Sequence, residues 1–190
     1  TAPFLVKNGT IQCTMKVLAA FKNDSLVQLD YDKEVEAEKL REQKSAEDYA
    51  AKNNLKTQKT KSGALVVIDN PGEGMKGDSG KVVSVRYKGY LQKDGKVFDS
   101  NMDSTKGGGQ PYDVTVGAHG VIPGWEEAFP YFAKGAKGKI IVPAFLAYGP
   151  RQSGPDIPPN SNLVFDIEIV DVKDAPAAAQ KPAPPMPQVR

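Results

Sequence analysis

Between residues 57 and 173 the sequence leaves room for only one short helix. Pro123 suits the first position of a helix, where its missing N–H is not needed, and Pro130 limits this helix to about two turns. Around it, β-type runs alternate with turns rich in Gly, Pro, Asn and Asp. We expect strands at Ala64–Asp69, Lys81–Leu91, Val97–Ser100, Tyr112–Val116, Lys139–Val142 and Asn162–Val172. The sequence therefore predicts the α+β class, with a mostly antiparallel sheet and one short α-helix.

The two ends of the chain differ in composition from this region. Residues 1–29 mix apolar and polar residues, and Thr10–Leu18 alternates like a strand. This segment is either an independent extension or the remnant of a preceding copy of the domain that follows. Residues 174–190 are rich in Ala and Pro and cannot bury a core, which predicts a flexible tail.

Residues 30–56 form a fourth segment, dense in Glu, Lys and Ala and free of Gly and Pro. This composition predicts a charged helix that ends near Asn53 and Asn54. Its apolar residues are sparse. Two interpretations stay open: a solvated linker helix, or a helix that pairs with another subunit.

Charge and composition exclude several functions. The chain of 190 residues has a net charge of +2, which gives no basic field to hold a nucleic acid backbone. A single cysteine, Cys13, excludes a disulfide within the chain. With only one histidine as well, most metal sites and most Cys/His catalysis are unavailable, so we expect no metal.

Two short motifs suggest enzyme classes that the surrounding sequence does not support. Gly72–Gly77 matches the G-x-G-x-x-G pattern, but a strand beginning at Lys81 follows it instead of the helix that a dinucleotide site needs. We interpret it as a glycine-rich turn between strands. Gly77–Gly80 (GDSG) resembles the nucleophile loop of chymotrypsin-like proteases. In that family the histidine precedes the serine, whereas His119 follows it here.

The only tryptophan, Trp125, lies at the start of the predicted helix. Glu126 and Glu127 follow it, and we assign both carboxylates to the positive end of the helix dipole rather than to catalysis. Aromatic residues on the predicted strands give more aromatic surface than a helix this short needs for anchoring. Trp125 is therefore either the floor of an apolar cleft or an ordinary core residue, and composition alone leaves both open.

Five motifs, taken in order, resemble those of the FKBP-type peptidyl-prolyl cis-trans isomerases. They are Val85–Leu91 (VRYKGYL), Asp94–Ser100 (DGKVFDS), Val121–Glu127 (VIPGWEE), Ala147–Gly149 (AYG) and Ile157–Glu168 (IPPNSNLVFDIE). The resemblance spans roughly Lys59 to Lys173, and the ordered set is far more specific than any single motif. It implies an FKBP-like fold for residues 57–173: an antiparallel sheet wrapped around the short helix, with the substrate proline in the hollow between them. An N-terminal helical extension would precede it.

The resemblance also implies the site residues. Those nearest the rotating bond are Tyr87, Phe98, Asp99, Tyr148 and Phe165. Those that bind substrate are Tyr112, Val114, Val121, Ile122, Trp125 and Ile157, with Trp125 as the floor. Two features depart from the family pattern: Tyr112 stands where Phe is usual, and Asn101–Gln110 looks longer than in compact members and lacks a basic partner for Asp99.

The implied activity is cis-trans isomerisation of X–Pro bonds, with no cofactor, by preferential binding of the twisted amide in a dry apolar pocket. Such a mechanism predicts a flat activity profile between about pH 4 and pH 9. The alternative is a non-enzymatic module or chaperone that binds proline peptides in the same pocket. Implied partners are unfolded or nascent proline-containing proteins, macrolide inhibitors and a second copy through residues 30–56, with no nucleic acid. Thr60–Ala64 and Pro71–Gly74 also resemble exported bacterial members, which favours the periplasm or cell envelope and leaves the cytoplasm open.

Overall fold

The computed structural model describes residues 14–17, 19–102 and 109–175. It divides the chain into two compact units, Thr1–Glu36 and Ala37–Arg190, which we treat separately. In the first unit, residues 14–17 have no regular structure. The other residues of the expected strand Thr10–Leu18 lie outside the described residues. No helix among the described residues is long and apolar enough to cross a membrane.

Helix α1 (Asp24–Lys52) begins in the first unit and ends in the second. It starts at Asp24 rather than near residue 30, because the Asn23 side chain accepts a hydrogen bond from the Leu26 N–H (3.0 Å) and so caps the first turn. It ends as expected before Asn54, whose left-handed backbone (φ 54°) stops the helix.

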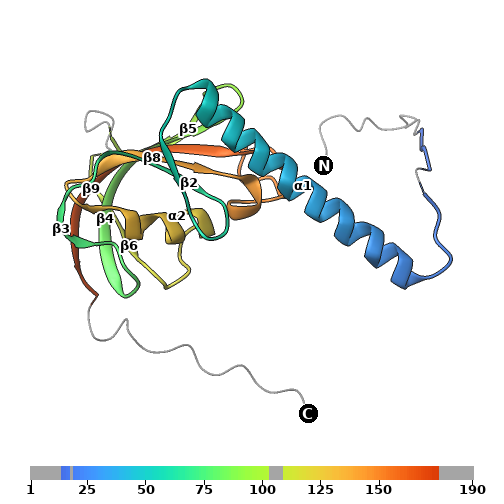
Figure 1. Cartoon of the computed structure of the whole chain (residues 1–190), viewed down its shortest axis with the longest axis horizontal. Coiled ribbons are helices and arrows are strands. Elements are labelled where there is room, and N and C mark those ends of the chain that lie inside the picture. The colour runs from blue at the N-terminus through green and yellow to red at the C-terminus, as the bar shows by residue number, and fades with distance from the viewer. Residues whose placement is uncertain (1–13, 18, 103–108, 176–190) are drawn as a thin grey trace, which may run out of the picture. The chain divides into compact units, whose positions relative to one another are not determined.

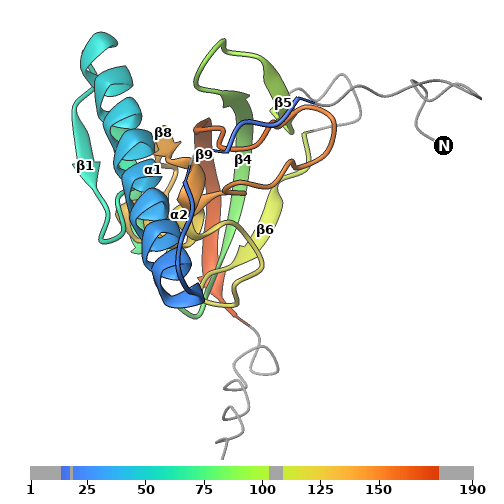
Figure 2. The ribbon, with the colours of Figure 1, turned by 90° about the vertical axis from the view of Figure 1, so that its right-hand side faces the viewer.

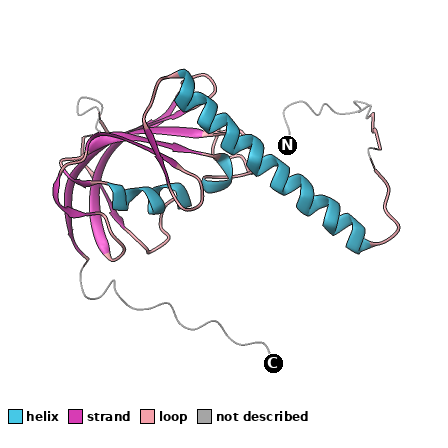
Figure 3. Cartoon of the chain, in the orientation of Figure 1, coloured by secondary structure: helices cyan, strands magenta, loops and turns pink. Residues whose placement is uncertain are grey.

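The second unit is built on one large antiparallel sheet (Figure 1, Figure 3). Its strands are β1 (Thr57–Lys59), β2 (Leu65–Asn70), β4 (Lys81–Leu91), β5 (Val97–Ser100), β6 (Tyr112–Thr115), β8 (Lys137–Val142) and β9 (Leu163–Asp174). They are arranged in the order β1-β2-β8-β9-β4-β5, and β6 pairs with the same strand, β4, as β5 does. A separate two-stranded sheet pairs β3 (Glu73–Lys76) with β7 (Ala133–Lys134).

The sheet curves around helix α2 (Pro123–Ala128), as Figure 1 shows. Two short 3₁₀ turns, η2 (Phe129–Tyr131) and η3 (Ala144–Leu146), flank β7 and β8 in the sequence. The main core lies between the sheet and α2, with Trp125, Ala128 and Phe129 buried against strand residues. Gly124 permits this approach, because a Cβ there would lie 2.5 Å from Val142 Cγ1. The predicted fold class is confirmed.

A second, smaller core lies on the opposite face of the sheet. Ile141 and Val164 alternate with inward-facing neighbours on β8 and β9, so their side chains point away from α2. There they pack with Leu65 and with Ala46 and Ala50 of α1. Figure 2 shows this part of α1 beside β1. The C-terminal half of α1 is thus packed on the sheet rather than solvated.

Several strand limits differ from those expected. Strands β4 and β5 match, whereas β6 ends one residue early and β2, β8 and β9 are displaced or extended by one or two residues. Strands β1, β3 and β7 were not expected, because they are short and carry little apolar pattern. Glu73–Lys76, which we had interpreted as a turn, forms β3, with Gly72 (φ 71°) and Gly74 (φ 83°) supplying the bends.

The packing of α1 on the sheet makes a testable prediction. Ala46 is completely buried, so Ala46→Asp places an unpaired carboxylate in the smaller core and should lower the free energy of unfolding by about 2–4 kcal/mol. Leu40→Asp, on the same helix but 70 % exposed, is the matched control and should change it little. Urea denaturation of both variants measures this difference. Equal denaturation midpoints for the two variants would contradict the packing of α1 on the sheet.

An aromatic candidate site at the start of helix α2

A cavity of about 220 Å³ opens at the first turn of α2. Residues from β4, β5, β6, α2, the loop after η3 and β9 converge on it. It is lined by Tyr87, Phe98, Asp99, Tyr112, Gly120, Val121, Ile122, Trp125, Tyr148 and Phe165. The structure therefore brings together most of the residues that the sequence singled out.

Trp125 forms the buried base of this cavity and is 5 % exposed. Tyr87 and Phe165 meet its indole edge-on, with ring centroids 5.1 and 5.0 Å away. Phe98 in turn packs edge-on against Phe165 at 5.8 Å. Such perpendicular contacts are favoured by the ring quadrupoles and fix the rings relative to one another. The result is a rigid apolar cup.

Gly89 explains how the rings fit so closely over β4. A Cβ at this position would lie 2.7 Å from the Phe98 ring and 2.9 Å from the Phe165 ring. Any larger residue would have to displace one of the two rings. The glycine in the motif Arg86-Tyr87-Lys88-Gly89 thus has a packing role that the motif alone does not reveal.

The cavity has few polar groups. The Tyr87 hydroxyl donates a hydrogen bond to Asp99 Oδ2 (2.5 Å). Burial and this neighbouring carboxylate raise the pKa of Tyr87 well above its ordinary value of 10, so the phenol stays neutral at physiological pH. The exposed hydroxyl-bearing rings of Tyr112 and Tyr148 complete the polar edge of the cavity.

Two N–H groups at the cavity lack acceptors. The Ile122 backbone N–H, at the N-cap of α2, has no hydrogen-bond partner among the described residues. The buried indole Nε1 of Trp125 likewise lacks an acceptor within the described part of the chain. Leaving this indole N–H unpaired costs about 1–3 kcal/mol. The indole is therefore held in place by its ring contacts and not by a hydrogen bond.

Two predicted residues do not line the cavity. Val114 is 3 % exposed and belongs to the main core. It shares a face of β6 with Tyr112, but it lies further along the strand, opposite Val83. Ile157 is also buried in the main core, and its backbone bridges to Ser153. Both residues support the walls from behind. The sequence analysis assigned both to substrate binding because a motif does not distinguish a lining residue from a core residue.

The sequence that forms this site matches known proteins of one family. A profile of the FKBP-type peptidyl-prolyl cis-trans isomerases matches residues 73–170. The chain belongs to that family. The "FK506-binding protein" of Neisseria meningitidis serogroup A is 37 % identical over 111 residues, which are 58 % of this chain and 97 % of that protein.

Longer relatives match as well. The protein named "FKBP-type peptidyl-prolyl cis-trans isomerase FkpA" from Escherichia coli K12 is 45 % identical over 136 residues, or 72 % of this chain. The match covers 47 % of that relative, so the chain spans about half its length. The crystal structure of E. coli FkpA has a TM-score of 0.60 at 36 % identity and covers 80 % of this chain and 67 % of that one. The crystal structure of a peptidyl-prolyl cis-trans isomerase from Pseudomonas syringae has a TM-score of 0.57 at 32 % sequence identity. The match covers 70 % of this chain and 95 % of that one.

Asn101 supports this FKBP-type site by holding β4, a role that the sequence did not predict. Its Oδ1 accepts a hydrogen bond from the Tyr87 N–H (2.6 Å), while its Nδ2 donates to the carbonyls of Val85 (3.1 Å) and Gln110 (3.0 Å). It therefore fixes the strand that carries Tyr87. Most of the segment 101–110 expected to be unusual lies outside the described residues.

The two glutamates after Trp125 have roles that the sequence did not predict. Glu126 Oε2 accepts a hydrogen bond from the Gly117 N–H (2.6 Å), which ties the loop before Val121 to α2. Glu127 accepts hydrogen bonds from the Thr60 hydroxyl (2.7 Å) and from both the N–H (2.9 Å) and the hydroxyl (2.5 Å) of Ser62. Each carboxylate thus anchors a loop to the helix, in addition to any contribution to the dipole.

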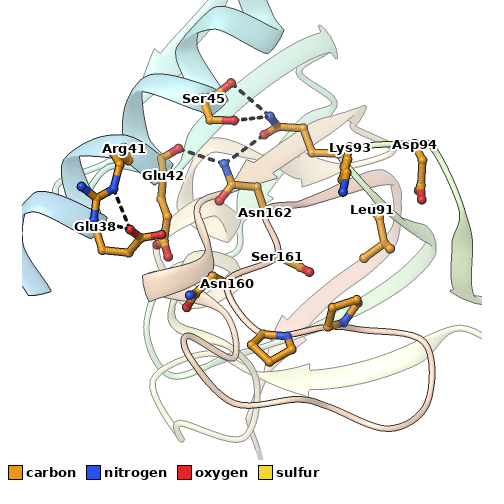
Figure 4. Close-up of a pocket in the computed structure, with 13 residues that line it drawn as sticks. Glu38, Arg41, Glu42, Ser45, Leu91, Lys93, Asp94, Asn160, Ser161 and Asn162 are labelled. Atoms are coloured by element: carbon orange, nitrogen blue, oxygen red, sulfur yellow. Dashed lines mark hydrogen bonds and ion pairs between the residues drawn. The ribbon is translucent and has the colours of Figure 1, made fainter. Parts of the chain in front are cut away.

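A larger hollow of about 540 Å³ lies beside the C-terminal half of α1, but it is not a comparable site (Figure 4). Polar and charged side chains and two prolines line most of it, and no aromatic ring does. Among the residues that the structure describes, no three His, Cys, Asp or Glu side chains are grouped so that they could hold a metal ion.

The Glu127 anchor predicts a change in acid stability. Burial alone would raise the pKa of Glu127, but the hydrogen bonds from Ser62 and Thr60 outweigh it, so the pKa lies below 4.5. A carboxyl whose pKa is lower in the folded state stabilises the protein at pH values above its unfolded-state pKa. That contribution is lost as the pH falls through the folded-state pKa. Glu127→Gln should therefore be about 1 kcal/mol less stable than wild type at neutral pH, with the gap closing in acid.

Denaturation of both proteins between about pH 7 and pH 3 measures this gap. Glu73→Gln, at an exposed position on β3, is the control that should follow the wild type throughout. A gap that stayed constant with pH would contradict the proposed ionised anchor.

Proposed function

We propose that this protein is a peptidyl-prolyl cis-trans isomerase that acts on X–Pro bonds of peptides and unfolded proteins. The observation that carries the proposal is the apolar cup over Trp125, with Tyr87, Phe98 and Phe165 as walls. Membership of the FKBP-type family supports it. A volume of about 220 Å³ suits a proline ring with its flanking atoms rather than a large cofactor.

The chemistry needs no bond between protein and substrate. Rotation about an X–Pro bond must break amide resonance, with a barrier of about 18–20 kcal/mol. The twisted amide has less charge separation than the planar one, so an apolar cup binds the twisted form better and thereby lowers the barrier. The unpaired Ile122 N–H is the donor that would hold the substrate carbonyl after the proline, while Tyr148 and Asp99 would contact the peptide near the rotating bond.

A protease-coupled assay on a proline-containing tetrapeptide tests the activity. We expect acceleration of the cis-to-trans step, and a Trp125→Phe variant with kcat/KM lowered about tenfold, since part of an apolar contact worth about 1.5–3 kcal/mol is lost. Activity should be flat from about pH 5 to pH 9, because no proton is transferred and Tyr87 stays neutral. Binding of the peptide without acceleration, followed by Trp125 fluorescence, would instead support the non-enzymatic module.

Ligands and location extend the proposal. The name of the Neisseria relative supports macrolides such as FK506 as inhibitors that occupy the same cup. Export to the bacterial periplasm or cell envelope is proposed on the sequence features between Thr60 and Gly74. Unfolded proline-containing proteins are the proposed substrates.

We further propose a homodimer through residues 30–56. Tyr31 is 62 % exposed and stands one turn before Val35 on the same face of α1. Light scattering should give the mass of two chains for the wild type and of one for Tyr31→Glu, because the variant places a charge on this face. Ser25→Glu, which adds the same charge near the start of α1, is the control and should stay dimeric. A single-chain mass for the wild type would exclude the dimer.

A further inference from the structure

The turn that carries Tyr148 into the cavity is held from outside by two side chains. Within η3, Leu146 and Ala147 donate their N–H groups to carbonyls of the turn itself. The N–H groups at its start have no such partner, as at any helix start. The Ala144 N–H donates to Asn162 Oδ1 (2.9 Å), and the Phe145 N–H donates to Glu42 Oε2 (2.7 Å).

Glu42 belongs to α1, so this second bond joins the helix to the site-bearing loop. Figure 4 shows the rest of the junction. Asn162 Nδ2 donates to the Glu42 carbonyl (2.8 Å) and to Gln92 Oε1 (3.2 Å). Gln92 Nε2 donates in turn to the carbonyl (3.0 Å) and hydroxyl (2.9 Å) of Ser45. The start of η3, the end of β4 and the start of β9 are thus linked to one stretch of α1.

The burial of Glu42 is costly and is not needed for docking the helix. Glu42 is 6 % exposed. Burial raises the pKa of its carboxyl, the hydrogen bond from Phe145 lowers it by less, and the neighbouring Glu38 carboxylate adds a smaller rise. Ala46 and Ala50 already seat the helix on the sheet through apolar contacts. The apolar contacts that dock the helix do not need a polar group at position 42, whereas the Phe145 N–H needs an acceptor there.

We propose that Glu42 is a positioning residue for Tyr148. Its carboxylate fixes the Phe145 N–H, three residues before Tyr148, and so sets where the phenol stands at the edge of the cavity. Gly149 closes the same turn by donating its N–H to the Ala144 carbonyl (2.8 Å), which leaves Tyr148 little freedom once both ends are held. The proposal rests on the proposed isomerase function. It places a functional residue of the site in α1, outside residues 73–170.

Substitutions at Glu42 in the full chain test this role. Glu42→Ala removes the acceptor and should raise KM for the tetrapeptide about fivefold, the factor that one ordinary hydrogen bond represents, with a smaller change in kcat. Glu42→Gln keeps an oxygen that can accept from the Phe145 N–H and should restore most of the wild-type KM. Asp48→Asn, on the same helix but exposed and paired with Lys44, should behave as wild type.

Two comparisons separate positioning from general loss of stability. Ala50→Gly weakens the same helix by about 1 kcal/mol without touching the bond to Phe145, so it should lower the melting temperature and leave KM unchanged. If Glu42 acts through Tyr148, adding Glu42→Ala to a Tyr148→Ala variant should cause no further rise in KM.

Amide hydrogen exchange gives a readout that does not depend on catalysis. Glu42→Ala should speed exchange at Phe145 and Gly149 and leave the amides of β4 unchanged. A wild-type protein without isomerase activity would sink the proposed function, while the exchange result would still report on the turn. An active wild type in which Glu42→Ala and Glu42→Gln share one KM, or in which the two alanine changes simply add, would overturn the positioning role.

Discussion

The antiparallel pairing of β4 with β9 is the constraint on which the rest of the structure depends. The two strands pair from Lys81 opposite Asp174 to Leu91 opposite Leu163, with one irregularity between Ser84 and Val85. Every other strand of the large sheet joins directly or through β8 to this ladder. Because side chains alternate along each strand, the ladder also places Tyr87 and Phe165 on the face toward Trp125.

The site is assembled around this ladder by polar anchors rather than by the sheet alone. Asn101 holds β4 at Tyr87, Glu126 holds the loop before Val121, and Glu127 holds the turn before β2 against α2. Each anchor accepts a hydrogen bond from a backbone N–H, that of Tyr87 in β4 for Asn101 and those of loop residues for the two glutamates. Apolar rings on the strands give the cavity its shape, and Glu126 and Glu127 tie the loops around Gly117 and Ser62 to α2.

The sequence predicted the fold class and the main strands because period-two alternation and turn residues are local signals. The resemblance to the FKBP family named Trp125 and most of the residues that line the cavity, since those residues occur in ordered motifs. It could not separate Val114 and Ile157 from the lining, because the depth of a side chain depends on sheet curvature for Val114 and on the path of the loop before β9 for Ile157. Sequence reasoning also missed Asn101, whose partners lie on β4 and near Gln110, beyond any local pattern.

The contact of α1 with the sheet was missed for a different reason. Ala46 and Ala50 are small and stand among charged residues, so the helix reads as polar. A signal was present in the strands: Ile140-Ile141-Val142 and Leu163-Val164-Phe165 are continuous apolar runs, as in strands buried on both faces. Such runs require a cover on each side of the sheet, and α2 can supply only one of them.

The two-sided burial of β8 and β9 has a practical consequence for anyone dividing this chain into fragments. A fragment cut at residues 73 and 170, the limits of the family match, would lose α1 and β2 and uncover Ile141 and Val164 side by side on neighbouring strands. Contiguous exposed apolar surface of this kind favours self-association and precipitation. The smallest soluble recombinant piece would therefore have to keep the C-terminal turns of α1, although the family match begins after them.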